Sequence, residues 1–215
     1  MLSPVATILS AARACHLGAV IGVSAWVLAT GVGFRALTEY EMRPGPPALA
    51  PDRWPAGTGL SFEHDRSNLV MFAHPQCSCS SASLDELMKI MTLCPGRLHV
   101  AVCFLNPDGE ADGWNHSALW RDANAIPGVE VVADRNGRLA TRFGATTSGQ
   151  VYLFACDGTR VFSGGITGAR GHEGDNRGRR AILALLRGEK SAITTAPVFG
   201  CALQDAPASP AGRRQ

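Results

Sequence analysis

The longest uninterrupted apolar run lies near the start of the chain. Leu17–Phe34 contains no charged residue, which suits a minimal transmembrane helix better than a short core helix. A cleaved signal peptide produces a similar pattern, but its apolar region is usually shorter, and no small-x-small cleavage site follows before Arg35. We therefore expect a short segment at residues 1–16 and an uncleaved membrane anchor at residues 17–36.

Charged residues on the two sides of this run are nearly balanced. Arg13 and His16 precede it, whereas Arg35 and Arg43 follow it. Basic residues favour the cytoplasmic side of a membrane. The pattern therefore gives a slight preference for a cytoplasmic amino terminus, with the rest of the chain outside.

Proline dominates the next segment. Five prolines lie between Pro44 and Pro55, and proline removes backbone donors and favours extended backbone. Residues 37–56 are predicted to be a semi-rigid linker, followed by a folded domain at residues 57–190. Residues 191–215 form a C-terminal extension that ends in Ala, Pro, Ser and Arg and is predicted to be partly disordered.

In the folded domain, continuous apolar runs alternate with segments whose apolar residues recur at helical spacing. Buried strands are predicted at Asn68–Ala73, Leu98–Leu105 and Val129–Ala133. After the first strand, apolar residues recur at helical spacing, and Ser83-x-x-Glu86 is a capping-box pattern that predicts a helix start.

The second half of the domain has its own signals. A helix is predicted at residues 117–125, and Gln150–Cys156 and Arg160–Ser163 flank Asp157-Gly158, a hairpin signal. A final helix is predicted at Arg177–Leu186. This order predicts an α/β fold with a central mixed sheet, helices on both faces, and right-handed crossovers between the early parallel strands.

Composition narrows the function classes. The chain has 20 basic and 18 acidic residues and no basic patch interleaved with aromatic residues, so no nucleic-acid partner is expected. Seven cysteines are too scattered for a small disulfide scaffold, and an odd number leaves at least one free thiol. Cys103 and Cys156 lie in or at the end of predicted strands and are expected in the core.

Cys77-Ser78-Cys79 lies between the first predicted strand and the helix that follows it. Amide groups and the dipole at a helix start stabilise an anion, which lowers the pKa of a thiol there. Cys77 comes first and is the predicted nucleophile, and Cys79 is the nearest candidate to resolve a mixed disulfide. Residues two apart on a helix point in different directions, so a disulfide between these two cysteines needs non-helical backbone.

Other interpretations of the two cysteines remain open. Both could be small core residues. Alternatively, Cys77 and Cys79 could hold copper(I) or zinc together with His74, His172 or Cys201. Cys201 lies beyond the last helix, where it is a resolving partner, a third ligand, or a loop cysteine with no role.

Two polar features lie near this turn in the predicted fold. His74 could stabilise the Cys77 thiolate as an imidazolium, or it is a strand-end residue facing water. Gly164–Asn176 is a glycine-rich segment that forms either a loop over the cysteine site or a flexible connector, and it carries His172, Glu173 and Asp175. It lacks the strand-turn-helix context of a dinucleotide-binding loop.

The first strand reads NLVMFAHP, the turn CSCS and the helix SLDELMKIM. These segments resemble the thioredoxin-like superfamily, particularly its membrane-anchored bacterial branch near the TlpA and peroxiredoxin-like groups. The stretch VEVVADRNGRLATRFGATTSGQVYLFACDGTRVFSGG is similar to the family's strand, Asp-x-x-Gly turn, short helix, loop and hairpin. GGITGARGHEGDN and the later FGC are similar to bacterial RedB-type proteins. The resemblance covers about Gly57–Gly188. It implies thiol–disulfide chemistry on a protein partner, no cofactor, and a single-pass protein of the bacterial inner membrane facing the periplasm.

Two positions depart from the family pattern. Ser80 stands where thioredoxins carry a second cysteine, and Gly149 stands where they carry a cis-proline that shapes the groove facing the reactive cysteine. We expect an oxidoreductase that carries out thiol–disulfide or peroxide redox chemistry at a Cys-x-Cys site. The alternatives are a copper- or zinc-binding metallochaperone-like module and a non-catalytic thioredoxin-fold binding domain.

Overall fold

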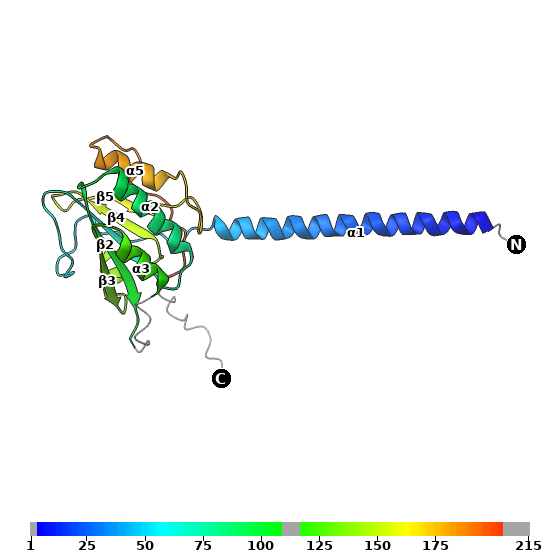
Figure 1. Ribbon diagram of the computed structural model, residues 1–215, viewed down its shortest axis with the longest axis horizontal. Helices are drawn as coiled ribbons and strands as arrows, with labels where there is room; N and C mark the ends of the chain where they lie inside the picture. Colours follow the sequence, from blue (N-terminus) through cyan, green and yellow to red (C-terminus); the bar gives the residue numbers. More distant parts are fainter. Residues whose placement is uncertain (1–3, 109–116, 204–215) are drawn as a thin grey trace. The chain divides into compact units, whose positions relative to one another are not determined.

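The computed structural model describes residues 4–108 and 117–203. The chain divides into two compact units, Met1–Met42 and Arg43–Gln215. The first unit is built on a long helix, and the second contains a sheet with the remaining helices of the described residues (Figure 1).

Helix α1, Pro4–Glu41, forms the first unit. Its stretch His16–Glu41 contains 26 residues, is exposed, and is long and apolar enough to cross a membrane. At ~1.5 Å per residue, a helix of this length exceeds the ~30 Å hydrocarbon core of a bilayer. The predicted anchor, residues 17–36, lies inside this stretch. Length and composition fit a membrane span, and they fit a signal sequence as well.

One sheet of five strands forms the centre of the second unit within the described residues, in the order β3-β2-β1-β4-β5. The strands are β1 Ser67–Ala73, β2 Leu98–Asn106, β3 Val129–Arg135, β4 Gln150–Phe154 and β5 Arg160–Gly164. β1 is central, parallel to β2 and antiparallel to β4. β3 continues the parallel half, and β5 forms a hairpin with β4. The sheet is therefore mixed, as expected.

Helices cover both faces of this sheet. They are α2 Cys79–Leu93, α3 Ala118–Ala125, α4 Arg138–Phe143 and α5 Arg177–Leu186. α2, α3 and α5 share one buried apolar cluster, and α4 contributes to the cluster on the opposite face. α2 and α3 supply the crossovers that parallel strands require.

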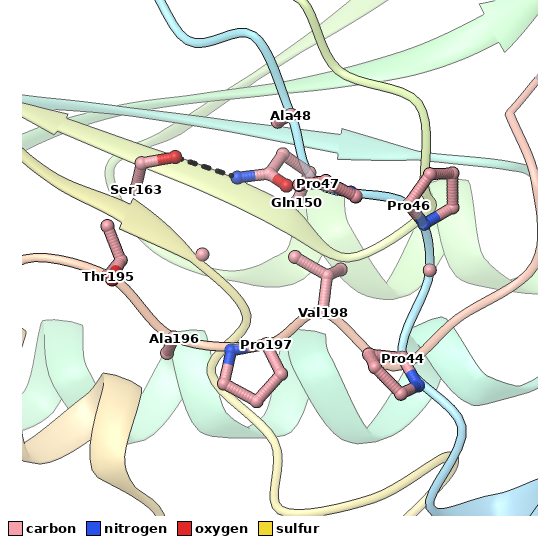
Figure 2. Close-up of a pocket in the computed structure, with 12 residues that line it drawn as sticks. Pro44, Pro46, Pro47, Ala48, Gln150, Ser163, Thr195, Ala196, Pro197 and Val198 are labelled. Carbon is pink, nitrogen blue, oxygen red and sulfur yellow. Dashed lines mark hydrogen bonds between the residues drawn. The ribbon is translucent and has the colours of Figure 1, made fainter.

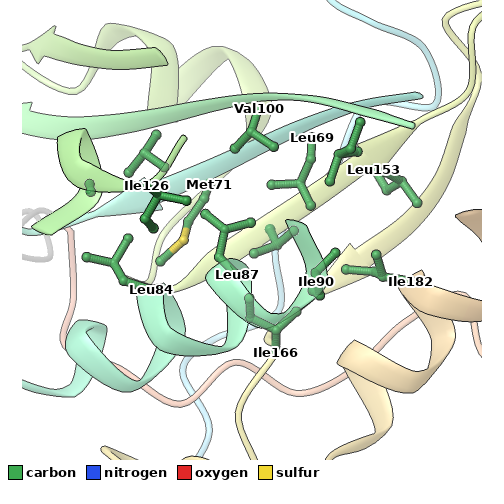
Figure 3. Close-up of a cluster of buried hydrophobic side chains, with 14 of the residues drawn as sticks. Leu69, Met71, Leu84, Leu87, Ile90, Val100, Ile126, Leu153, Ile166 and Ile182 are labelled. Carbon is green, nitrogen blue, oxygen red and sulfur yellow. The ribbon is translucent and has the colours of Figure 1, made fainter. Parts of the chain in front are cut away.

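The apolar side of α2 fixes this helix against the central strand. Leu84, Leu87 and Ile90 lie against Leu69 and Met71 of β1 (Figure 3), and all five side chains are buried. Burying an aliphatic side chain of this size contributes roughly 1.5–3 kcal/mol. This packing holds the start of α2 at the carboxyl end of β1.

Residues 43–56, which belong to the predicted linker, are part of the second unit and contact its helix α4 and strand β4. Trp54 makes edge contacts with Phe143 and Phe154, with ring centroids 5.6 and 5.3 Å apart. Aromatic pairs of this kind add about 0.5–1.5 kcal/mol beyond the burial of their area. This stretch therefore belongs to the folded unit and is not a free spacer, because half-buried Trp54 packs against the apolar cluster on this face of the sheet.

Helix α2 begins earlier than the capping-box pattern predicts. Its first residue is Cys79, and Ser83 and Glu86 are buried within it. The Glu86 carboxylate accepts hydrogen bonds from Lys89 at 2.8 Å and Arg179 at 2.6 Å. The predicted helix start was wrong because the Glu86 side chain serves these ion pairs and does not cap the backbone.

Candidate functional site

Cys77 lies in the turn between β1 and α2. Its amide donates to the His74 carbonyl at 3.0 Å, and the Ser80 amide donates to the Cys77 carbonyl at 3.0 Å. These bonds turn the chain tightly from strand to helix. Cys77 is buried, and Cys79, the first residue of α2, is half-buried. The expected order of strand, cysteine turn and helix is confirmed.

The C-terminal segment brings a third cysteine to this turn. The Ser148 amide donates to the Cys201 carbonyl at 2.8 Å, and the Leu203 amide donates to the Thr146 carbonyl at 2.9 Å. This short antiparallel pairing holds the segment against the loop before β4. It thereby places Cys201 beside Cys77, 124 residues earlier in the chain.

Two glycines permit this close approach. A Cβ atom on Gly200 would collide with the carbonyl oxygen of Ser148. Gly149 has a φ of +89°, and its amide donates to the Phe72 carbonyl at 2.8 Å. Proline has no amide hydrogen and a fixed negative φ, so it could take neither role. Gly149 thus connects the loop to the end of β1 by a hydrogen bond that proline cannot make.

Residues 43–48 hold the C-terminal segment from the other side. The Gly45 amide donates to the Val198 carbonyl at 2.8 Å. The segment around Val198 runs opposite the proline-rich stretch (Figure 2), and Gln150 and Ser163 of the sheet line the same cavity of about 440 Å³. The segment that carries Cys201 is therefore held between residues 43–48 and the sheet.

The three thiols form one cluster. The Sγ atoms of Cys77 and Cys201 lie 3.0 Å apart, and the Sγ atoms of Cys77, Cys79 and Cys201 all lie within 4.8 Å of one another. In the part of the chain that the structure describes, no histidine or carboxylate joins this group. The sequence left Cys79 and Cys201 as alternative partners of Cys77, and the structure brings both to it.

The environment of Cys77 favours its thiolate. Burial raises the pKa of the Cys77 thiol, but hydrogen bonds from the Cys201 thiol, the Ser80 hydroxyl and the backbone amides of Cys201 and Cys79 outweigh burial and lower it. Amides at the start of a helix are the donors expected to stabilise a thiolate in this position.

The other two thiols are held in their neutral form. Burial and the charge of Cys77 raise the pKa of Cys79. Burial, the hydrogen bond with Cys77 and the charges of Cys77 and Cys79 raise the pKa of Cys201 to about 12. Of the three thiols, Cys77 is therefore the one whose surroundings favour the negative charge.

Arg170 is a site residue that the sequence interpretation missed. Its guanidinium donates to the carbonyl of Gly200, the residue before Cys201. Its positive charge also lowers the pKa of both Cys79 and Cys201, opposing the other contributions. The sequence does show a basic side chain inside the glycine-rich segment. Nothing in the local sequence, however, indicates that this side chain binds the backbone carbonyl of Gly200.

No family model and no curated protein matches the chain. Among solved structures, an uncharacterized conserved protein from Geobacillus kaustophilus matches with a TM-score of 0.57 and 18% identity, covering 77% of this chain and 100% of that chain. A hypothetical protein from Sinorhizobium meliloti 1021 has a TM-score of 0.55 and 22% identity, covering 75% and 93%. A secreted Mycobacterium tuberculosis disulfide oxidoreductase homologous to E. coli DsbE has a TM-score of 0.41 and 12% identity, covering 59% and 84%.

The sheet topology agrees with the resemblance found in the sequence. Three parallel strands, an antiparallel hairpin beside the central strand, and a cysteine turn between that strand and its helix form the arrangement that the resemblance implied. The fold is thioredoxin-like. The TlpA, peroxiredoxin-like or RedB branch within this fold stays a prediction.

Polar contacts join the cysteine turn to the loop before β4 in this thioredoxin-like fold. The Ser148 hydroxyl accepts a hydrogen bond from the His74 amide at 2.7 Å and lies 2.6 Å from the Ser80 hydroxyl. The His74 ring accepts a hydrogen bond at Nδ1 from the Gln76 amide at 3.2 Å. His74 thus borders the cysteine turn as expected, and its proposed action on the Cys77 thiolate stays a prediction.

The glycine-rich segment lies beside the site without bringing its histidine to the sulfur atoms. His172 is exposed, with Nδ1 2.8 Å from the Arg170 carbonyl oxygen, and it is not part of the thiol cluster. Glu86 of α2 accepts a hydrogen bond from the Gly174 amide at 2.9 Å. This buried carboxylate anchors the segment, so Arg170 is presented from a fixed loop.

The remaining described cysteines lie elsewhere. Cys94 and Cys103 are buried in the two apolar clusters on opposite faces of the sheet, so the sheet separates them. Burial raises the pKa of Cys103 well above its ordinary value, which makes this thiol inert. Cys156 was predicted to be in the core but is exposed, because β4 ends at Phe154 and Cys156 already belongs to the hairpin turn.

Proposed function

We propose that this chain is a thiol–disulfide oxidoreductase in which Cys77 is the nucleophile and Cys201 is the resolving thiol. The observation that carries this proposal is the 3.0 Å distance between their sulfur atoms. A disulfide needs an approach of about 1 Å more, to ~2.05 Å. The lowered pKa of Cys77 supports its role, because the thiolate is the reactive form.

The reaction proceeds in two exchanges. The Cys77 thiolate attacks one sulfur of a protein disulfide, forms a mixed disulfide, and releases the other substrate sulfur as a thiolate that takes up a proton. Cys201 then loses its proton and attacks the Cys77 sulfur, which forms the Cys77–Cys201 disulfide and releases the second substrate thiol. The substrate gains two electrons and this chain loses two, so a dithiol donor must restore the thiols. The sulfur atoms carry the electrons, and the exchange needs no cofactor.

The first exchange also activates the resolving thiol. The raised pKa of Cys201 depends partly on the hydrogen bond and the negative charge of Cys77. Both are lost when Cys77 enters the mixed disulfide, whereas the positive charge of Arg170 remains. Cys201 therefore releases its proton more readily at the step in which it must act.

A hydroperoxide is the second electrophile that suits the same thiolate. Attack on the peroxide oxygen would break the O–O bond, give a sulfenic acid at Cys77, and release an alcohol, or water from hydrogen peroxide, after protonation. Cys201 would then condense with the sulfenic acid to form the same disulfide and a molecule of water. Consumption of hydrogen peroxide by the reduced chain, compared with its rate of disulfide exchange, determines which electrophile is preferred.

The location of the chain forms part of this proposal. Helix α1 is long and apolar enough to be a membrane span, and disulfides persist in oxidising compartments such as the bacterial periplasm. We assign α1 as a single-pass anchor in the bacterial inner membrane, with Arg43–Gln215 in the periplasm. Labelling of the exposed thiol of Cys156 in intact cells, by a reagent that permeates the outer but not the inner membrane, tests this orientation.

Mapping of cysteine alkylation across a series of glutathione redox buffers tests the chemistry. The full-length chain in detergent should form a peptide linked through Cys77 and Cys201 at a defined potential. Cys201→Ser should accumulate a mixed disulfide between glutathione and Cys77, because the proposed resolving thiol is absent, whereas Cys156→Ser serves as the control and should behave like the wild type. Full exchange activity in Cys77→Ser would refute the assignment.

A further inference from the structure

Cys79 has no role in the proposed exchange, although its sulfur lies within 4.8 Å of both sulfurs that do. We propose that the reduced chain binds one Cu(I) ion between the sulfur atoms of Cys77, Cys79 and Cys201. This function goes beyond the oxidoreductase activity, since binding the ion requires no disulfide exchange. Copper is here a cargo that the site takes up and releases.

The spacing of the sulfur atoms suits a three-coordinate ion. Three sulfurs surrounding a metal in one plane at ~2.3 Å lie about 4 Å from one another. All three sulfur atoms lie within 4.8 Å of one another, and those of Cys77 and Cys201 are 3.0 Å apart. Binding the ion therefore requires the Cys77–Cys201 pair to open by about 1 Å.

The donor set distinguishes copper from zinc. Soft thiolates select Cu(I), which is satisfied by fewer sulfur ligands than the four that a structural zinc site requires. Among residues 4–108 and 117–203, no imidazole or carboxylate joins the three sulfurs as a fourth ligand. His172, the candidate from the sequence, is exposed and held at Nδ1 against the Arg170 carbonyl.

The charges around the cluster support metal uptake. Each thiol gives up its proton to become a ligand, so a monovalent ion with three thiolates leaves two negative charges. The Arg170 guanidinium, which donates to the carbonyl of Gly200 beside Cys201, offsets part of this charge. The side chains of Cys79 and Cys201 are half-buried, so the ion can enter from solvent while Cys77 forms the buried end of the site.

Metal binding and disulfide formation exclude each other. The Cys77–Cys201 disulfide consumes two of the three ligands, so the site exists in the reduced chain and is lost on oxidation. Cys79 separates the two functions, because it is a ligand for the ion but not a partner in the proposed disulfide.

Competition for Cu(I) tests the proposal. The full-length chain, reduced in detergent without oxygen, is titrated into the coloured complex of Cu(I) with bicinchoninate, and loss of colour reports transfer of the metal. We expect one Cu(I) per chain and a sulfur-only first shell by X-ray absorption. Cys79→Ser should weaken binding by at least about tenfold, because outer-shell changes alone typically cost 10–100-fold.

Two controls make the outcome decisive. Cys156→Ser removes an exposed cysteine outside the cluster and should keep the wild-type affinity. Cys79→Ser should still form the Cys77–Cys201 disulfide, which shows that the variant is folded. Three outcomes would overturn the copper site: no transfer to the wild type, equal affinity in Cys79→Ser, or displacement of the ion by an equimolar amount of Zn(II). If the wild type takes up no Cu(I) but still carries out thiol–disulfide exchange, the copper proposal is wrong and the oxidoreductase proposal is unaffected.

Discussion

Cys77 combines two properties that normally oppose each other, burial and a lowered pKa. Burial alone raises the pKa of this thiol, and hydrogen bonds from its neighbours reverse the effect. Among these donors, the Ser80 hydroxyl occupies the position at which a second cysteine would complete a Cys-x-x-Cys motif. The departure from the family pattern therefore places, at the position of that second cysteine, a hydroxyl that stabilises the Cys77 thiolate.

Ser80→Ala should make Cys77 less acidic. A hydrogen bond to a charged group contributes about 1.5–3 kcal/mol, so its loss should destabilise the thiolate by about that much and raise the pKa of Cys77. The pH profile of Cys77 alkylation by iodoacetamide, followed by mass spectrometry, should shift to higher pH. Ser81→Ala, at the exposed neighbouring position, is the control. Coincident profiles for the two variants would contradict the role of Ser80.

Most elements of the second unit could be predicted from the local pattern. The apolar run before the cysteine turn predicted β1, and Asp157-Gly158 predicted the hairpin of β4 and β5. The start of α2 could not be predicted in this way. Glu86 fits a capping box locally, but its carboxylate binds groups on α5 and on the glycine-rich segment. A local motif cannot distinguish these uses, because both require a carboxylate at the same position.

Glu86 should be an important link between α2, α5 and the segment that presents Arg170. Its side chain is buried and pairs with Arg179 and Lys89. Removing one partner of a buried pair costs about 3–5 kcal/mol. Glu86→Gln keeps some of the hydrogen bonds and should reduce the free energy of unfolding at pH 7 by about 3 kcal/mol, measured by urea denaturation. The exposed Glu189 provides the control, and Glu189→Gln should be neutral.

The pH dependence of this effect has a definite sign. Burial raises the pKa of Glu86, but hydrogen bonds from Lys89 and the Gly174 amide and the charge of Arg179 outweigh burial and lower it. A carboxylate with a lowered pKa stabilises the fold above its unfolded pKa of about 4.3, and this contribution is lost as the pH falls through the lower folded value. The difference between wild type and Glu86→Gln should therefore narrow below about pH 4. A constant difference would show that the charge of Glu86 does not contribute.

At the scale of the whole molecule, the site joins distant parts of the chain. The sequence placed Cys77 and Cys79 after the first predicted strand, but it left the partner of Cys77 open. Cys201 reaches the turn through backbone hydrogen bonds to the loop before β4. Hydrogen bonds between backbone groups leave no periodic pattern of side-chain types in the sequence. Arg170 was missed for a similar reason, because its guanidinium binds the backbone carbonyl of Gly200.

Oxidation should stabilise the second unit. The two sulfurs belong to residues 124 apart, and in the chain-entropy account a disulfide closing a loop of about 100 residues contributes about 4.7 kcal/mol. Urea denaturation of the wild type should therefore show a higher midpoint without reductant than with it. Cys201→Ser should show one midpoint under both conditions. Equal midpoints for the oxidised and reduced wild type would contradict the disulfide.

The same separation changes what a protease does to the molecule. When Cys77 and Cys201 are joined, most of the second unit becomes a covalent ring. A single cleavage between them opens the ring, but both products remain attached through the sulfur bridge and migrate together on a non-reducing gel. The identical cleavage in the reduced chain yields two separate fragments. The redox state of one pair of sulfurs thus decides whether a nicked chain survives as one molecule.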